Sequence, residues 1–105
     1  MVDEVWLRNG LQYYSSKGKY LYNSYARIKE LRVVFEYAER ENEVLAFALP
    51  DDVNTSWLVI DTGHHEDVYA VTIYIDAIYK GKDKANTLCV TDLMLVKLIP
   101  TENGV

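Results

Sequence analysis

The chain has 105 residues, half of them hydrophobic, and a formal net charge of −5 at pH 7. This length suits one domain with a single modest core, and the hydrophobic content excludes a disordered chain. Nucleic acids and anionic membrane surfaces are bound by basic surfaces, so the acidic charge argues against both classes of partner. We therefore expect one folded domain over residues 1–105.

No targeting or membrane-inserting segment is predicted. Met1 to Glu4 is followed by a polar strand pattern instead of the apolar centre of a signal peptide. No apolar run approaches the ~20 residues that span a bilayer. The single cysteine, Cys89, excludes an internal disulfide, and its apolar surroundings predict a buried, inert thiol. The cellular compartment stays open, and the chain is compatible with being a piece of a larger protein.

Alternation of apolar and polar side chains predicts about six strands. The longest runs from Val68 to Tyr79, with its odd-numbered residues on a buried face. The apolar run from Leu88 to Leu98 is expected to pair with it, across a polar loop that contains Gly81 and Asn86. The other strands are expected at residues 2–8, 27–37, 44–49 and 56–61, with polar turns at 38–43 and 62–67.

Residues 27–37 are the most ambiguous segment, because their apolar residues also fit a helical stripe. The run from Val33 to Tyr37 is rich in β-branched and aromatic residues, which favours a strand. The later chain has the same β character. The sequence therefore predicts an all-β protein, an antiparallel sandwich or barrel without an internal domain boundary.

The segment from Leu11 to Ala26 holds five of the nine tyrosines, mixed with serine, glycine, lysine and asparagine. This mixture has no clear period and predicts a long ordered loop. Loops of this length inside a compact domain are usually functional or disordered, and the aromatic content argues against disorder. Tyr13 and Tyr14 are expected to be exposed, because Ser15 and Ser16 follow them directly.

Successive antiparallel strands bring alternate loops to the same end of a sandwich. Residues 9–26, 50–55 and 80–87 are therefore expected at one end, and residues 38–43 and 62–67 at the other. Aromatic rings beside amide, carboxylate and ammonium groups suit a sugar, whose C–H faces stack on rings and whose hydroxyls need polar partners. The candidate glycan-binding residues are Asn9, Tyr13, Tyr14, Tyr20, Asp51, Asn54, Lys82 and Asn86.

Other site chemistries find less support. Asp51, Asp52 and Asn54 offer oxygen ligands for a structural calcium ion, but a plain turn after Pro50 is the simpler interpretation. The pair His64-His65 invites a metal or hydrolase interpretation, yet a third ligand at a convincing spacing is not found and a solvated hairpin is simpler. No catalytic triad or phosphate-binding loop is visible. We expect a non-enzyme without a cofactor.

Two stretches carry a family resemblance. The first contains Asn9-Gly10, Asn23-Ser24 and Arg27 to Leu31, and the second runs from Ile78 to Asp83 and on from Asn86 to Leu93. They resemble the NADase-type glycan-binding domains, discoidin-like jelly-roll modules within the galactose-binding-like sandwiches. The resemblance covers nearly the whole chain and implies a jelly-roll β-sandwich that binds a glycan.

Members of that family begin with further strands before the Asn-Gly turn. The resemblance therefore implies a truncated sandwich, which would expose sheet edges and part of an apolar face. We expect a homodimer, a strand exchange or a larger parent protein that covers the gap. The leading hypothesis is a carbohydrate-binding module, and the alternative is a protein-interaction or assembly domain without a sugar ligand.

Overall fold

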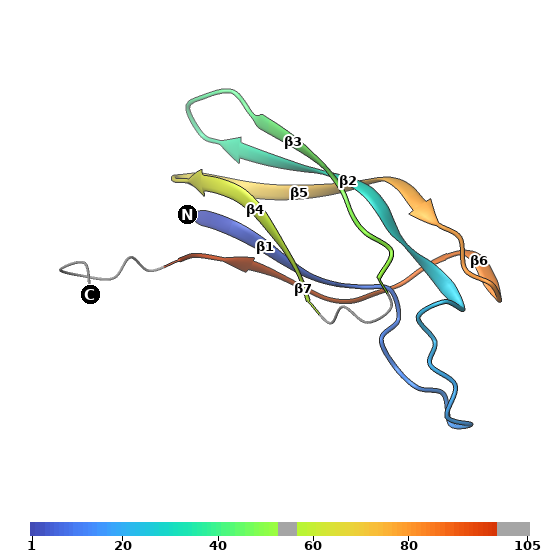
Figure 1. Ribbon diagram of the computed structural model, residues 1–105. Helices are drawn as coiled ribbons and strands as arrows, with labels where there is room; N and C mark the ends of the chain where they lie inside the picture. The colour runs from blue at the N-terminus through green and yellow to red at the C-terminus, as the bar shows by residue number, and fades with distance from the viewer. Residues whose placement is uncertain (53–56, 99–105) are drawn as a thin grey trace.

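The structure, a computed structural model, describes residues 1–52 and 57–98. These residues contain no helix, so the all-β prediction is confirmed, as is the strand at residues 27–37. The described part of the chain accordingly has no helix able to cross a membrane. Figure 1 shows its seven strands: β1 Val2–Asn9, β2 Tyr25–Tyr37, β3 Glu43–Ala48, β4 Leu58–His65, β5 Val68–Tyr79, β6 Lys84–Leu88 and β7 Val90–Val96.

The strands form two sheets. One has the order β4-β1-β7 and the other the order β3-β2-β5, with β6 paired to the first residues of β2. All pairings are antiparallel except the short one between β2 and β6. The two sheets pack face to face as a small β-sandwich, with β1 and β2 at their centres (Figure 1).

The core lies between the inner faces of β1 and β2. Its largest fully buried apolar side chains are Val5 and Leu7 from β1 and Leu31, Val33 and Phe35 from β2. Their odd spacing is the period-2 pattern of a strand with one buried face. Burying each such side chain stabilises the fold by roughly 1.5–3 kcal/mol, so this small set supplies much of the hydrophobic driving force.

The predicted pairing of residues 68–79 with residues 88–98 is wrong. β5 pairs with β2, whereas β7 pairs with β1 in the other sheet. The connection between them forms β6, which ends at Leu88, and Cys89 is only half-buried between β6 and β7. A hairpin is the default for neighbouring strands, but here the connection is long enough to cross to the other sheet. This crossing also raises the strand count to seven.

The predicted turn at residues 62–67 is shorter than expected, because β4 continues to His65. Thr62 is buried, and its hydroxyl donates to the carbonyl oxygen of Asp3 over 3.0 Å. The sequence did not reveal this end of the strand, because its polar side chains are also typical of surface turns.

In β5 the predicted inward face is only partly buried. Val71, Ile73 and Ile75 lie on the core side, but none of the residues of β5 is fully buried.

Asn9 joins the two sheets where β1 ends. Its amide nitrogen donates to the carbonyl oxygen of Ile28 over 2.8 Å, and the Ile28 backbone nitrogen donates to its amide oxygen over 2.8 Å. Both residues are buried. Buried backbone groups need partners, so this reciprocal pair satisfies β2 at a point where it has no strand partner on that side.

Replacing Asn9 with alanine should lower the free energy of unfolding by about 3 kcal/mol, because two buried backbone groups of Ile28 lose their partners. Urea denaturation monitored by tyrosine and tryptophan fluorescence measures this change. Asn23→Ala is the matched control, since Asn23 is exposed and should change stability by less than about 0.5 kcal/mol. Equal stability of both variants would contradict the role assigned to Asn9.

Candidate functional site

Three segments far apart in the sequence meet at one end of the sandwich. They are the connection between β1 and β2 (residues 10–24, called the tyrosine loop), residues 49–52 after β3, and residues 80–84 after β5. The Lys82 nitrogen donates to Asn23 O over 2.8 Å, and the Lys84 nitrogen donates to Ser24 O over 2.8 Å. The tyrosine loop projects from this end beside β6, as Figure 1 shows. The sequence prediction placed these segments at a common end.

An ion pair between a buried arginine and a partly exposed aspartate holds the base of this end together. The Arg27 side chain is only 7% exposed, and its guanidinium donates to both Asp51 carboxylate oxygens over 2.6 and 3.1 Å. The Tyr22 hydroxyl donates to the same carboxylate over 3.0 Å. The guanidinium also lies over the Tyr22 ring, 5.0 Å from its centroid. Burial and the hydrogen bond to Asp51 raise the pKa of Tyr22, so its phenol stays protonated.

Two glycines allow close packing at this end of the sandwich. Gly10 has a φ of +73°, and an added Cβ would lie 2.7 Å from Cγ of Arg27. At Gly81 an added Cβ would lie 2.5 Å from the carbonyl oxygen of Ser24. A side chain at either position would push the loops apart. The Asn-Gly and Lys-Gly pairs in the sequence therefore mark points where backbones approach closely.

The tyrosine loop carries a row of contacting rings from its base to its tip. Tyr22 is buried at the base and stacks on Tyr20, with ring centroids 6.5 Å apart and an interplanar angle of 11°. Tyr20 in turn contacts Tyr14, with centroids 4.8 Å apart. Tyr13 and Tyr14 are 57% and 71% exposed. The loop thus presents aromatic surface to solvent on a packed aromatic support.

Backbone hydrogen bonds order the loop tip. The Ser15 nitrogen donates to Lys19 O over 2.7 Å, and the Leu21 nitrogen donates to Tyr13 O over 2.9 Å. The Lys19 ammonium reaches across to Asp83 at 2.6 Å, which ties the loop to the turn after β5. This contact lowers the pKa of Asp83. Ordering before binding reduces the entropy that a ligand must offset.

The structure separates the predicted site residues into two groups. Asn9 and Asp51 make their hydrogen bonds within the fold, Asn9 to Ile28 and Asp51 to Arg27. Exposed or half-exposed positions on the loop end are occupied by Tyr13, Tyr14, Tyr20, Lys82 and Asn86. Asn54 lies outside the described residues.

Sequence reasoning missed Tyr22, Arg27 and the contact of Lys19 with Asp83. The available signal for a buried charge that needs a carboxylate was an arginine placed between two apolar residues, Ala26 and Ile28, near the start of β2.

The two histidines lie at the opposite end of the sandwich. His65 is buried and stacks on Phe35, with centroids 3.9 Å apart. Its Nε2 donates to Thr62 O over 2.7 Å, and its Nδ1 lies 2.8 Å from the Tyr37 hydroxyl and 3.3 Å from a Glu43 carboxylate oxygen. These bonds make it a core residue. Within residues 1–52 and 57–98 no group of three or more histidine, cysteine or acidic side chains could hold a metal ion.

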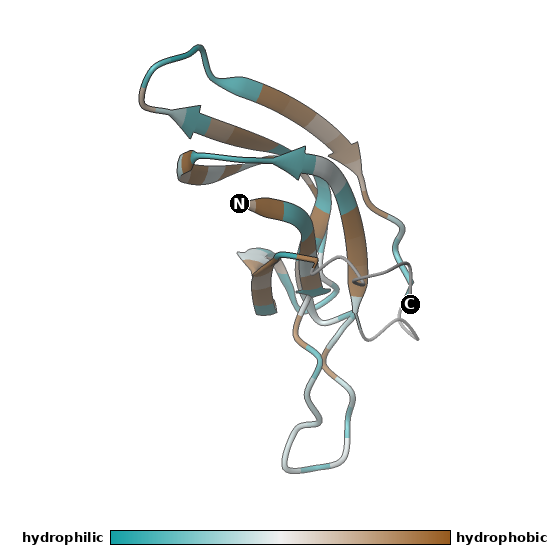
Figure 2. Ribbon diagram, turned by 90° about the vertical axis from the view of Figure 1, so that its left-hand side faces the viewer, coloured by the Kyte–Doolittle hydropathy of each residue, from teal (hydrophilic) through white to brown (hydrophobic). Residues whose placement is uncertain are grey.

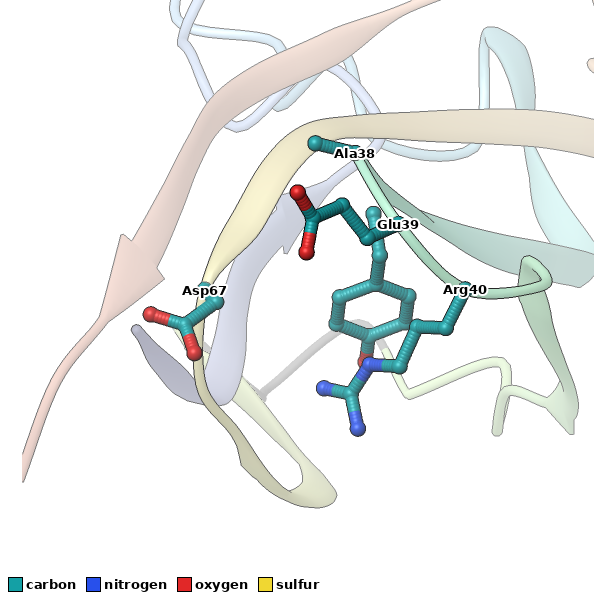
Figure 3. Close-up of a pocket in the computed structure, with 5 residues that line it drawn as sticks. Ala38, Glu39, Arg40 and Asp67 are labelled. Atoms are coloured by element: carbon teal, nitrogen blue, oxygen red, sulfur yellow. The ribbon is translucent and has the colours of Figure 1, made fainter.

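A pocket adjoins this end of the sandwich. Figure 3 shows the residues that line it, which are Tyr37, Ala38, Glu39, Arg40 and Asp67. The Arg40 guanidinium lies 3.8 Å from the centroid of the Tyr37 ring and donates to the carbonyl oxygen of Glu66 over 3.0 Å. The arginine therefore closes the ring face that a ligand would need for stacking.

Comparisons with protein-family models, with curated proteins and with solved structures find no match for this chain.

Replacing Asp51 with alanine should lower the free energy of unfolding by about 3 kcal/mol, because the Arg27 charge would stay buried without a partner. Thermal unfolding followed by circular dichroism measures the loss. Glu41→Ala removes an exposed acidic side chain from the connection between β2 and β3 and serves as the control. A loss no larger than that of the control would show that water replaces the carboxylate at little cost.

His64 should make stability depend on pH. Its Nδ1 lies 2.5 Å from an Asp3 carboxylate oxygen and its Nε2 lies 3.1 Å from Glu66. The bond to Asp3 and then that to Glu66 raise the pKa of His64, while the bond to His64 lowers the pKa of Asp3. The histidine's contribution is complete below its ordinary pKa of 6.5 and disappears as the pH rises through the raised value. The aspartate's contribution is complete above 3.8 and disappears as the pH falls through the lowered value.

His64→Gln should therefore lower the unfolding temperature most between pH 3.8 and 6.5, and the difference should shrink as the pH rises above 6.5. Thermal unfolding of both proteins across this range measures the difference. Asp3→Asn should show the same dependence on pH above 3.8. A constant difference between His64→Gln and the native protein at all pH values would contradict the pairing.

Proposed function

We propose that this chain is a non-catalytic carbohydrate-binding module that holds a glycan against its tyrosine loop. The observation that carries the proposal is the pair of exposed rings, Tyr13 and Tyr14, on a loop ordered by its own hydrogen bonds. Exposed aromatic surface on an ordered, projecting loop is typical of a recognition surface.

The surroundings of the rings suit a sugar. A pyranose offers C–H faces that pack on aromatic rings, and Tyr14 is supported from behind by Tyr20. Sugar hydroxyls need donors and acceptors, which Lys19 and Asp83 offer beside the loop. The exposed side chains of Lys82 and Asn86 lie on the adjoining turn and on β6 and add further hydrogen-bonding groups.

The family resemblance supports the same function. The motifs that carry it include Asn9-Gly10 and the glycine turn at Gly81, which lie together at the loop end. Membership of the galactose-binding-like jelly rolls, with a glycan as ligand, is part of this proposal. Asn9 and Asp51 then act by positioning the loops, and the tyrosines contact the sugar.

A glycan array followed by titration calorimetry on the best hit tests the proposal. Tyr13→Ala combined with Tyr14→Ala should weaken binding by about tenfold or more, since each aromatic contact contributes about 0.5–1.5 kcal/mol. Tyr69→Ala is the matched control, because Tyr69 is an exposed tyrosine on β5 at the other end of the sandwich. Undiminished binding by the double variant, or an array without any hit, would overturn the proposal.

A further inference from the structure

One side of the sandwich leaves apolar side chains uncovered. β5 and β7 are edge strands, and Figure 2 shows both on the side of the sandwich away from β3 and β4. The register makes Leu93, Leu95 and Ile75 face inward, opposite Leu7, Val5 and Leu31 on the neighbouring strands. Those neighbours are at most 1% exposed, whereas Leu93, Leu95 and Ile75 are 44%, 49% and 40% exposed. The fully buried core therefore ends at β1 and β2, and the inward-facing side chains of β5 and β7 remain partly exposed.

The two edges are long and lack lysine and proline, the residues that most often keep edge strands apart, although bulges interrupt the pairing of β5 with β2. β5 has 12 residues and β7 has 7, and neither contains a lysine or a proline. Their only charged residues are Asp76, which pairs with Arg32 at 2.8 Å, and Asp92. Natural edge strands are commonly protected by lysine, proline or short length. Two long edges of this composition are suited to pairing with further strands.

Each edge strand has acidic residues near its start and a lysine after its end, and this order favours one orientation of a partner strand. Glu66 and Asp67 precede β5, and Lys80 follows it. On the second edge Asp92 lies in the first half of β7, and Lys97 follows the strand. Antiparallel pairing of each strand with a copy of itself brings acidic groups toward basic groups at both ends, whereas parallel pairing would bring like charges together.

We propose that a second copy of this chain covers the open side. A two-fold axis perpendicular to the sheets pairs β5 with β5 and β7 with β7 of the partner, both antiparallel, in one self-complementary interface. Both sheets then continue across the dimer, and Leu93, Leu95 and Ile75 become buried. Because the paired strands run in opposite directions, the two tyrosine loops lie at opposite ends of the dimer and stay exposed.

Sedimentation velocity over a range of protein concentrations tests the dimer. The native chain should have twice the monomer mass of 12.1 kDa. Leu93→Lys combined with Leu95→Lys should give the monomer, because the charges would be buried at the interface. Val44→Lys combined with Val59→Lys, which changes residues of similar exposure (55% and 53%) on β3 and β4, should remain dimeric. A native monomer at all concentrations, or a dimer that tolerates the lysines in β7, would overturn the proposal.

A charge exchange at two exposed positions tests the orientation. Apart from the hydrogen bond that Asp92 accepts from the neighbouring Leu93 nitrogen over 2.8 Å, it leaves the fold unchanged. Asp92→Lys and Lys97→Asp should each raise the dissociation constant of the dimer by about tenfold, since both are repeated by symmetry. The protein carrying both changes should regain the native dissociation constant. A failure to regain it would overturn the antiparallel arrangement. This test remains valid even if the variant with lysines at positions 93 and 95 does not fold. Glycan binding by the tyrosine loop is measured separately and does not depend on this result.

Discussion

The packing of β1 against β2 supports every other part of this molecule. The largest fully buried apolar side chains all come from these two strands. Every other strand is hydrogen-bonded to one of them: β4 and β7 to β1, and β3, β5 and β6 to β2. Small sheets have little stability alone and need an apolar face covered by another layer. The reciprocal bonds of Asn9 with Ile28 then fix how the two central strands cross at the loop end.

Polar networks complete the two ends of this narrow core in different ways. At the loop end, the buried Arg27 pairs with the partly exposed Asp51, which also accepts a hydrogen bond from Tyr22 at the base of the row of tyrosine rings. At the other end, His65 fills a core position and uses both ring nitrogens within the fold. The first arrangement supports an exposed surface that projects from the sandwich, and the second covers the core. This difference is why the proposed binding surface lies at the tyrosine loop.

A core confined to the sheet centres also explains why the edges matter. Apolar side chains on β5 and β7 have neighbours on one flank only, so they remain partly in water. Their exposure costs free energy that a further layer or strand would recover. The proposed glycan surface lies at an end of the sandwich and the proposed dimer surface along its side, and both lie outside the small core between β1 and β2. They share no residue, so each function is compatible with the other.

The sequence by itself determined most of the strands, because side-chain alternation is a local property that survives in any all-β arrangement. It missed β6 and the last residues of β4, whose polar side chains are typical of turns. It also determined that three loops share one end, that Tyr13 and Tyr14 are exposed, and that His64-His65 lies away from them. Only the tertiary structure decided which strands pair, since β5 and β7 are both apolar enough to pair with each other, yet they lie in different sheets. It alone turned Asn9 inward and paired Asp51 with Arg27, because hydrogen bonds to Ile28 and Arg27 depend on distances across the fold that no local pattern encodes.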